Sequence, residues 1–242
     1  MATTETSFHL FGHPVINLDK ARSRHKRKSL GELAYVFVVA PGRSGSTLVQ
    51  TILNSIPGWK ILGENAGSLQ GLVQSLNATH KTRYRQKARV PDNGPWFGAT
   101  EILVDKYAAS LGRGFTKHIL RPERNTRVTG FKEVRWDWED LTANLEGVQA
   151  IFPNARFILN IRNPQDIAMS AWWSTSKDSI HEVSKIVSAI ENTAEEMSKD
   201  SFLLRYEEYV SEPSSLKALF DWLGEEWNEP TIRKILVHKL AH

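Results

Sequence analysis

The chain contains no cysteine among its 242 residues. This absence excludes disulfides, thiolate-bound metals and a cysteine nucleophile, and it is typical of proteins from a reducing compartment. No apolar run approaches the roughly 18 residues that a membrane helix needs. The first residues also lack the charged-then-apolar order of a signal peptide. We therefore expect a cytoplasmic protein without a membrane span.

A strong excess of one charge is also absent, since the net charge is only +4. The basic residues instead gather in three clusters, at 20–28, 81–89 and 113–127. Such a cluster is either a solvated face or a mouth that attracts an anionic cofactor or acceptor. No nucleic-acid-binding module accompanies them, so we do not expect a nucleic acid partner.

Length and pattern predict one domain over 31–242, preceded by a basic arm over 1–30, with a loop and helical cap around 64–127. Apolar runs predict strands, and apolar residues at helical spacing predict helices between them. Alternating strands and helices favour an α/β fold, a P-loop-like three-layer α/β/α arrangement with a central, mostly parallel sheet. The expected strands cover 34–40, 59–62, 128–134, 155–161 and 201–205. Expected helices end near 54 or cover 66–76, 101–111, 141–151, 183–197 and 216–223, and a long loop is expected over 77–100.

A glycine turn follows the first expected strand and precedes a helix. Its sequence is Pro41-Gly42-Arg43-Ser44-Gly45-Ser46-Thr47. A strand, a tight turn and a helix in this order direct backbone N–H groups and a positive helix end at one point, which suits a phosphate. The hydroxyls of Ser44, Ser46 and Thr47 are further donors. The standard nucleotide P-loop has a lysine before the hydroxyl residue, whereas this turn supplies Arg43. The alternative is an ordinary glycine turn with a capped helix.

A second polar group follows the strand at 155–161. Arg162 lies at the strand end, and Pro164 starts a helix that Asp166 is expected to cap. Ser170 is expected about two turns into that helix. An arginine and a serine placed in this way can bind one phosphate. The alternative is a surface arginine and an incidental helical serine.

Together the two motifs resemble those of sulfotransferases that use 3′-phosphoadenosine-5′-phosphosulfate (PAPS). Residues 41–48 resemble the 5′-phosphosulfate loop in its carbohydrate- and tyrosyl-sulfotransferase form, and 157–164 with Ser170 resemble the 3′-phosphate motif. Residues 203–208 resemble a third family stretch, and the resemblance spans about 34–224. It implies PAPS as co-substrate, bound by residues 41–47, Arg162, Ser170 and Tyr206. We expect no metal, because a sulfuryl group carries less negative charge than a phosphoryl group and the sequence has no convincing metal-ligand spacing.

The resemblance also implies catalytic roles. Glu64, after Gly63, resembles a proposed base of tyrosyl-sulfotransferases, and a carboxylate there can take the acceptor proton. His80 and His118 are alternative bases. Lys132 resembles a family lysine near the sulfuryl group, and with Arg43 it is expected to stabilise charge in the transition state. If the strand continues, Arg135 faces away from Lys132, so at most one of the two enters the site.

Several alternatives stay open. The acceptor is a hydroxyl or an amine, on a small molecule or a carbohydrate, and the basic clusters suggest that it is anionic. Trp172 and Trp173 line the acceptor or adenine site, or belong to the core. The family's late glycine-rich loop is not found after Gly224, where Arg233, Lys234, Lys239 or the basic arm is a substitute. A P-loop kinase or NTPase lacks support without the lysine and a magnesium pattern, and an inactive nucleotide-binding protein is the other alternative.

Overall fold

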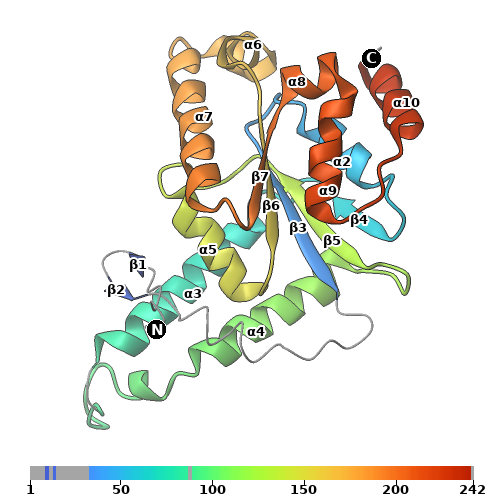
Figure 1. Ribbon diagram of the computed structural model, residues 1–242. Coiled ribbons are helices and arrows are strands. Elements are labelled where there is room, and N and C mark those ends of the chain that lie inside the picture. The colour runs from blue at the N-terminus through green and yellow to red at the C-terminus, as the bar shows by residue number, and fades with distance from the viewer. Residues whose placement is uncertain (1–8, 11–12, 15–32, 87–88, 241–242) are drawn as a thin grey trace, which may run out of the picture.

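A five-stranded parallel sheet forms the centre of the protein (Figure 1). The computed structural model describes residues 9–10, 13–14, 33–86 and 89–240. The strand order is β4-β5-β3-β6-β7, so the first strand of the sheet in sequence, β3, is also its middle strand. The strands cover Ala34–Val39 (β3), Trp59–Leu62 (β4), Val128–Glu133 (β5), Arg156–Ile161 (β6) and Ser201–Arg205 (β7).

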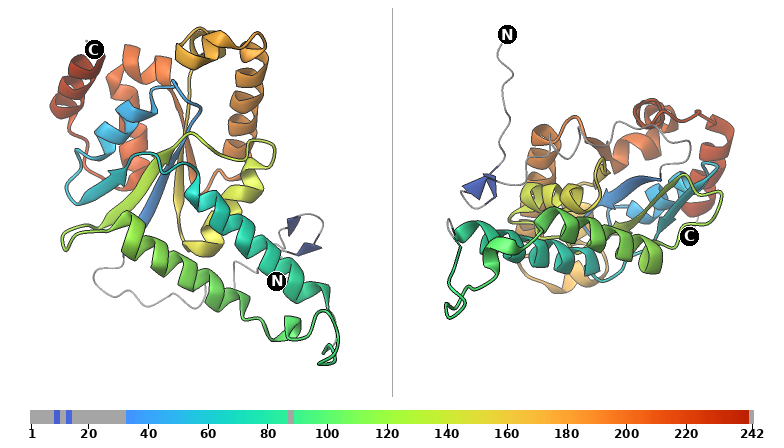
Figure 2. Two further views of the ribbon diagram at one scale, coloured as in Figure 1. Left: turned by 180° about the vertical axis from the view of Figure 1, so that it is seen from behind. Right: turned by 90° about the horizontal axis from the view of Figure 1, so that it is seen from below.

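Helices α2, α8, α9 and α10 cover one face of this sheet (Figures 1 and 2). Leu48, Val49 and Ile52 of α2 pack there with Val36 and Val38 of β3. The core on this face is closed by apolar residues of the three C-terminal helices. The helices cover Ser46–Leu53 (α2), Tyr206–Ser211 (α8), Lys217–Leu223 (α9) and Glu229–Leu240 (α10).

The opposite face is covered by α3, α4, α5 and α7, whose apolar stripes pack against Phe37, Phe131 and Phe157. Because both faces are covered, the central strands read as continuous apolar runs rather than as alternating ones. The α3–α4 pair extends beyond the sheet at its lower edge (Figure 1). These helices cover Ser68–Arg85 (α3), Val104–Phe115 (α4), Leu141–Ile151 (α5) and Ser179–Glu196 (α7), and the short α6 covers Pro164–Ala168.

The α/β prediction with a parallel sheet is confirmed, and every expected strand is present to within one residue at each end. The loop expected over 77–100 is wrong in its first part, because α3 continues to Arg85. Residues 77–85 have no apolar stripe, but they contain neither glycine nor proline. Thr79 and Thr82 donate to the carbonyls four residues before them, so their hydroxyls are satisfied within the helix. The helix at 101–111 is shifted to α4.

The basic arm over 1–30 falls largely outside the described residues. Its described part is an antiparallel pair of two-residue strands, His9–Leu10 (β1) and His13–Pro14 (β2). The cap predicted around 64–127 contains α3 and α4, whose buried residues belong to the same core as α5 and α7.

The order of the strands changes direction at β3, and the loops at the carboxyl edge of the sheet there diverge to opposite sides. From β3 the chain adds β4 and β5 on one side and then β6 and β7 on the other. Ligands of open α/β sheets bind at such a switch point, beyond the carboxyl ends of the strands. The glycine turn follows β3 and therefore lies at this point, between the ends of β5 and β6.

Candidate active site

The glycine turn joins β3 to α2 through two left-handed residues. Arg43 has φ 70° and Gly45 has φ 85°. A side chain at Gly45 would collide with the Tyr206 ring at the start of α8. A glycine is therefore required here for both its conformation and its space. The first amides of α2 have no partner within the helix and are directed at the turn, as an anion site needs.

A buried and uncharged network supports the turn from below. Ser44 donates its hydroxyl to Pro41 O at 2.8 Å, and Asn160 Nδ2 donates to Ser44 O at 2.8 Å. Tyr209 of α8 in turn donates to Asn160 Oδ1 at 3.2 Å. Ser44 is fully buried, and its hydroxyl therefore stabilises the turn from within. Burial of Tyr209 raises the pKa of its hydroxyl far above the ordinary value, so it acts here as a neutral donor.

Residues from the β6 end meet the glycine turn. Arg43 donates from Nε to Ser170 Oγ at 3.0 Å, and Arg162 donates from Nη1 to Arg43 O at 3.4 Å. The Arg162 guanidinium lies over the Tyr206 ring, 4.6 Å from its centre, and forms an ion pair with Asp166 at 3.5 Å. Four of the residues predicted to contact the cofactor are thus in one cluster, which we call the arginine cluster: Arg43, Arg162, Ser170 and Tyr206.

Two local predictions in this segment are wrong. Asn163, not Asp166, caps α6, since its side chain accepts from Gln165 N, while Asp166 lies in the first turn and binds Arg162. Ser170 is not inside a helix, because α6 ends at Ala168 and Ser170 precedes a short 3-10 helix over 171–175. Its extended backbone directs the hydroxyl to Arg43.

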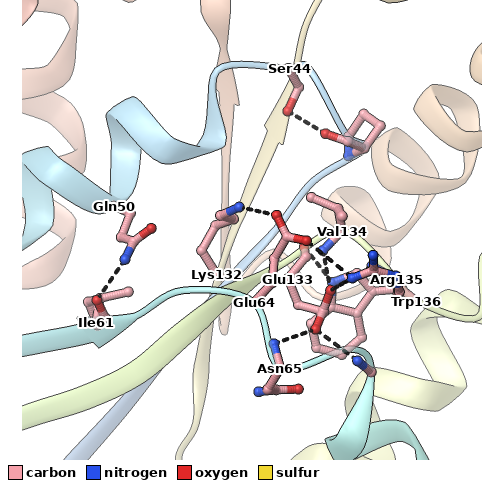
Figure 3. Close-up of polar contacts among 12 residues, drawn as sticks. Ser44, Gln50, Ile61, Glu64, Asn65, Lys132, Glu133, Val134, Arg135 and Trp136 are labelled. Carbon is pink, nitrogen blue, oxygen red and sulfur yellow. Dashed lines mark hydrogen bonds and ion pairs between the residues drawn. The ribbon is translucent and has the colours of Figure 1, made fainter. Parts of the chain in front are cut away.

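A second cluster forms where β4 and β5 end (Figure 3). Lys132, only 6% exposed, donates to Glu64 Oε1 at 2.5 Å, and Arg135 donates from Nη1 to Glu64 Oε2 at 3.2 Å. The hydrogen bond from Lys132 is the largest cause of a lowered pKa for Glu64, with further lowering by Arg135 against an opposing effect of burial. Glu64 is therefore a carboxylate at neutral pH. We call Glu64, Lys132 and Arg135 the carboxylate cluster.

The expectation that at most one of the two cations enters the site assumed a strand that continues to Arg135, and this condition is not met. Strand β5 ends at Glu133, so the alternation of side chains does not extend to Arg135. Lys132 reaches Glu64 from the strand, while Arg135 reaches it from the segment after the strand. Lys132 pairs in register with Val38 of β3, which lies three residues before Pro41. The carboxylate cluster is therefore one strand away from the start of the glycine turn.

Other predicted residues lie elsewhere. His118 is in the π-helix Thr116–Leu120. Its first residue, Thr116, bonds to Tyr35 near the amino end of β3, at the opposite edge from the site. His80 is twelve residues into α3, about 18 Å along the helix from its start. Trp173 is half-buried and donates from Nε1 to Gly42 O at 3.3 Å, and it packs on the core near α7. Arg233 of α10 forms ion pairs with Glu229 and Glu212.

Three residues of this region were missed by sequence reasoning: Asn160, Tyr209 and Glu133. Asn160 interrupts the apolar run of β6, and a buried amide in a strand needs partners that motifs do not name. Glu133 follows Lys132 and must face the other side of β5, where a buried carboxylate requires donors. Its carboxylate accepts hydrogen bonds from four backbone amides around the carboxylate cluster (Figure 3).

No group of three or more histidine, aspartate or glutamate side chains within the described residues is arranged to hold a metal ion. No helix in this part of the chain combines the length and apolarity needed to cross a membrane.

The chain is similar to several solved sulfotransferase structures. A sulfotransferase domain from the olefin synthase of Synechococcus PCC 7002 aligns with a TM-score of 0.50 at 16% identity, covering 85% of this chain and 78% of that domain. A sulfotransferase domain of the curacin biosynthetic pathway gives 0.45 at 16% identity, over 81% and 76% of the two chains. A sulfotransferase from Mycobacterium avium gives 0.47 at 14% identity, over 91% and 72%.

At these identities, the olefin synthase domain supports the fold alone. No curated protein sequence matches the chain. The sequence profile of a family described as the sulfotransferase family matches residues 35–229, which include both clusters and, apart from Ala34, all five strands of the sheet. The chain is therefore a transferase that belongs to the sulfotransferase family.

Proposed function

We propose that the protein transfers a sulfuryl group from PAPS to a hydroxyl acceptor. The observation that carries the proposal is the meeting of Arg43, Arg162 and Ser170 beyond β3 and β6, next to a turn rich in backbone donors. A kinase or NTPase needs a triphosphate site with a lysine and magnesium ligands. A second phosphate site formed by Arg162 and Ser170 suits a nucleotide that carries a 3′-phosphate as well.

The residues present fit this co-substrate. Arg162 Nε is buried, and no described residue accepts a hydrogen bond from it. A buried donor without a hydrogen-bond partner is energetically costly, so a phosphate oxygen is a suitable partner for this N–H group. Because Gly45 has no side chain, its backbone packs directly against the Tyr206 ring, which brings Tyr206 next to the glycine turn. We assign the 5′-phosphosulfate to residues 41–47 and the 3′-phosphate to Arg162 and Ser170, with Tyr206 beside them.

The carboxylate cluster supplies the chemistry of transfer in this proposal. Glu64 takes the proton of the acceptor hydroxyl as the acceptor oxygen forms its bond to sulfur. The bond between sulfur and the 5′-phosphate oxygen breaks, and adenosine 3′,5′-bisphosphate (PAP) leaves. Negative charge grows on the leaving oxygen, and Lys132 and Arg43 are the cations proposed to stabilise it. In the structure Lys132 is bonded to Glu64. Movement of the Lys132 ammonium towards PAPS would leave Glu64 free to accept the proton.

The acceptor side of the proposal rests on resemblance and charge. The arginine in the glycine turn favours a carbohydrate or peptide hydroxyl over a small phenol. Arg135 is 59% exposed beside Glu64 and is available to an anionic acceptor. Sulfated or carboxylated sugars are therefore the first acceptors to screen, and amines the second.

Calorimetric titration with PAP tests the proposal. We expect the native protein to bind PAP, and Arg162→Ala to bind it about 10- to 100-fold more weakly, since a hydrogen bond to a charged group contributes ~1.5–3 kcal/mol. Arg205→Ala is the matched control. Arg205 ends β7 and pairs with Glu191, so its loss removes the same charge one strand away. No heat of binding with the native protein, or equal losses in both variants, would contradict the proposal.

A further inference from the structure

Glu133 is a buried carboxylate that none of the proposed steps uses. It is 1% exposed and lies at the end of β5, beside Lys132 in sequence but on the other face of the strand. Side chains alternate along a strand, so Glu133 shares the face of Phe131, which packs in the core with α3 and α5. Lys132 shares the face of Val128, which packs in the core with α2. A buried acid in this position needs compensation, and its partners show what it holds.

Both carboxylate oxygens of Glu133 accept from backbone amides. Oε2 accepts from Asn65 N at 3.1 Å and from Gly67 N at 2.9 Å. Oε1 accepts from Val134 N at 2.8 Å and from Arg135 N at 3.1 Å. The first pair belongs to the turn after β4, and the second pair to the segment after β5. Glu133 therefore ties together two segments that are far apart in sequence.

These two segments carry Glu64 and Arg135, the two members of the carboxylate cluster that lie outside strand β5. Glu64 directly precedes Asn65, and Arg135 is itself one of the bonded residues. The turn after β4 is conformationally demanding, with Ala66 at φ 58° and Gly67 at φ 73°. Left-handed residues of this kind persist only where the surroundings hold them. The amides fixed by Glu133 flank Ala66 on both sides.

We infer that Glu133 is a positioning residue, which holds the Glu64 turn and the Arg135 segment so that Glu64 faces Lys132. The inference rests on the proposed function for its catalytic part, since it assigns to Glu133 the geometry of the proposed base. The side chain itself does not reach the reacting atoms. It acts through the backbone of residues 65 and 67 on one side and of residues 134 and 135 on the other, and its Oε1 also forms a 3.8 Å ion pair with Arg135 Nη1.

The chemistry of the contact explains why a carboxylate is needed. An ionised carboxylate only accepts hydrogen bonds, and its two oxygens can serve four donors. A glutamine keeps the shape, but its NH₂ group would face two backbone N–H donors and leave them without an acceptor. An aspartate keeps the charge but is one methylene shorter, so it cannot serve both segments at the present distances.

The test is a double-mutant cycle between Glu133→Gln and Glu64→Gln. The readout is release of sulfur-labelled sulfate from PAPS, with water as the acceptor, together with PAP affinity by calorimetry. We expect Glu133→Gln to lower kcat about 10- to 100-fold, as a small displacement of a reacting group does. The KM for PAPS and the affinity for PAP should stay within about threefold of the native values, because the arginine cluster is untouched. In the Glu64→Gln background, Glu133→Gln should have almost no further effect on kcat.

Thr129→Val is the matched control. Thr129 is buried in the same strand and donates to Lys60 O of β4 at 3.0 Å, but it lies at the opposite end of β5 from the site. Its replacement removes one half-buried hydrogen bond between β4 and β5. We expect a lower melting temperature with native kcat. If Glu133→Gln does not fold, Glu133→Asp takes its place in the same cycle, with a smaller expected loss of kcat.

Two results would overturn the inference. One is a native kcat in a folded Glu133 variant. The other is an equal fractional loss of kcat with and without Glu64, because a general structural role gives additive effects. Hydrogen exchange of a peptide covering residues 63–68 adds a readout that does not need turnover, and it should accelerate in Glu133→Gln but not in Thr129→Val. If the native protein neither binds PAP nor releases sulfate, the proposed function fails, while the exchange result still decides whether Glu133 holds the turn.

Discussion

The arginine cluster and the carboxylate cluster are supported in opposite ways. Under the glycine turn, the buried groups are uncharged, namely the Ser44 hydroxyl, the Asn160 amide and the Tyr209 hydroxyl. At the ends of β4 and β5, the support is ionic, with Lys132 and Glu133 buried and charged. Charge appears in the arginine cluster only where a ligand would lie, on Arg43 and Arg162.

This difference matches what each side is proposed to do. A turn that binds through backbone N–H groups must keep one shape at every pH, and a neutral network does not titrate in the physiological range. A group that accepts a proton must instead be tuned by neighbouring charges. Changes in pH should therefore perturb the carboxylate cluster, whereas substitutions that add bulk should perturb the glycine turn. Three predictions test this division, from the largest effect to the smallest.

Gly45→Ala should have the largest effect. The new Cβ would meet the Tyr206 ring, and the left-handed backbone adds about 1–2 kcal/mol of strain. We expect PAP affinity to fall by about 100-fold or more, which corresponds to roughly 3 kcal/mol. Gly98→Ala is the control, because Gly98 has a similar φ of 80° and open space around it. Calorimetry should show native PAP affinity for Gly98→Ala, and a native affinity for Gly45→Ala would disprove the steric requirement.

Tyr209→Phe should have an intermediate effect that does not depend on pH. It removes the bond to Asn160 Oδ1, a loss of about 1 kcal/mol, or about 2–4 °C in melting temperature for a chain of this size. PAP affinity should weaken a few-fold because the glycine turn loses support. Tyr107→Phe removes a hydroxyl that bonds Ser75 between α3 and α4, and it should lower stability without weakening PAP. A Tyr209→Phe effect that varies between pH 5 and pH 8 would contradict a neutral role.

Glu64→Gln should have the smallest effect on stability, and this effect should depend on pH. The folded pKa of Glu64 is lowered, so its ion pairs stabilise the fold above the unfolded value of about 4.3. That stabilisation is lost as the pH falls through the lower folded value. Because Glu64 is partly exposed, we expect the variant to melt at most a few degrees lower at pH 7. The melting temperatures of the native protein and the variant should converge in acid. A difference that widens in acid would contradict a lowered pKa for Glu64.

The sequence predicted one of the two clusters better than the other. The glycine turn and Arg162 follow long apolar runs, which form central strands whatever their surroundings. The sequence predicted catalytic roles for both Lys132 and Glu64. It did not predict the ion pair between them, because that contact depends on the order of the strands in the sheet. Glu133 was not predicted, because its role comes from backbone amides 66 to 68 residues away along the chain. Asn160 and Tyr209 were missed for the same reason, since a buried pair across β6 and α8 leaves no local motif.

The extent of α3 shows a different limit. The apolar stripe of α3 ends near Leu76, while the helix continues to Arg85. Hydrophobic spacing therefore marked only the part that packs on the sheet. The distal part contacts the loop that follows it, where the Arg85 guanidinium lies 5.5 Å from the centre of the Trp96 ring. Periodicity identifies the face of a helix in the core but not the end of a helix that extends beyond it.

The selectivity of the native protein for a 3′-phosphate is the most direct measurement of the central proposal. One calorimetric series with PAP, with adenosine 5′-monophosphate and with ATP plus magnesium compares the three nucleotides under one set of conditions. We predict that PAP binds at least about 10- to 100-fold more tightly than the monophosphate, since Arg162 and Ser170 would contact only the former. Equal affinity for PAP and the monophosphate, or tighter binding of ATP with magnesium, would contradict the proposal.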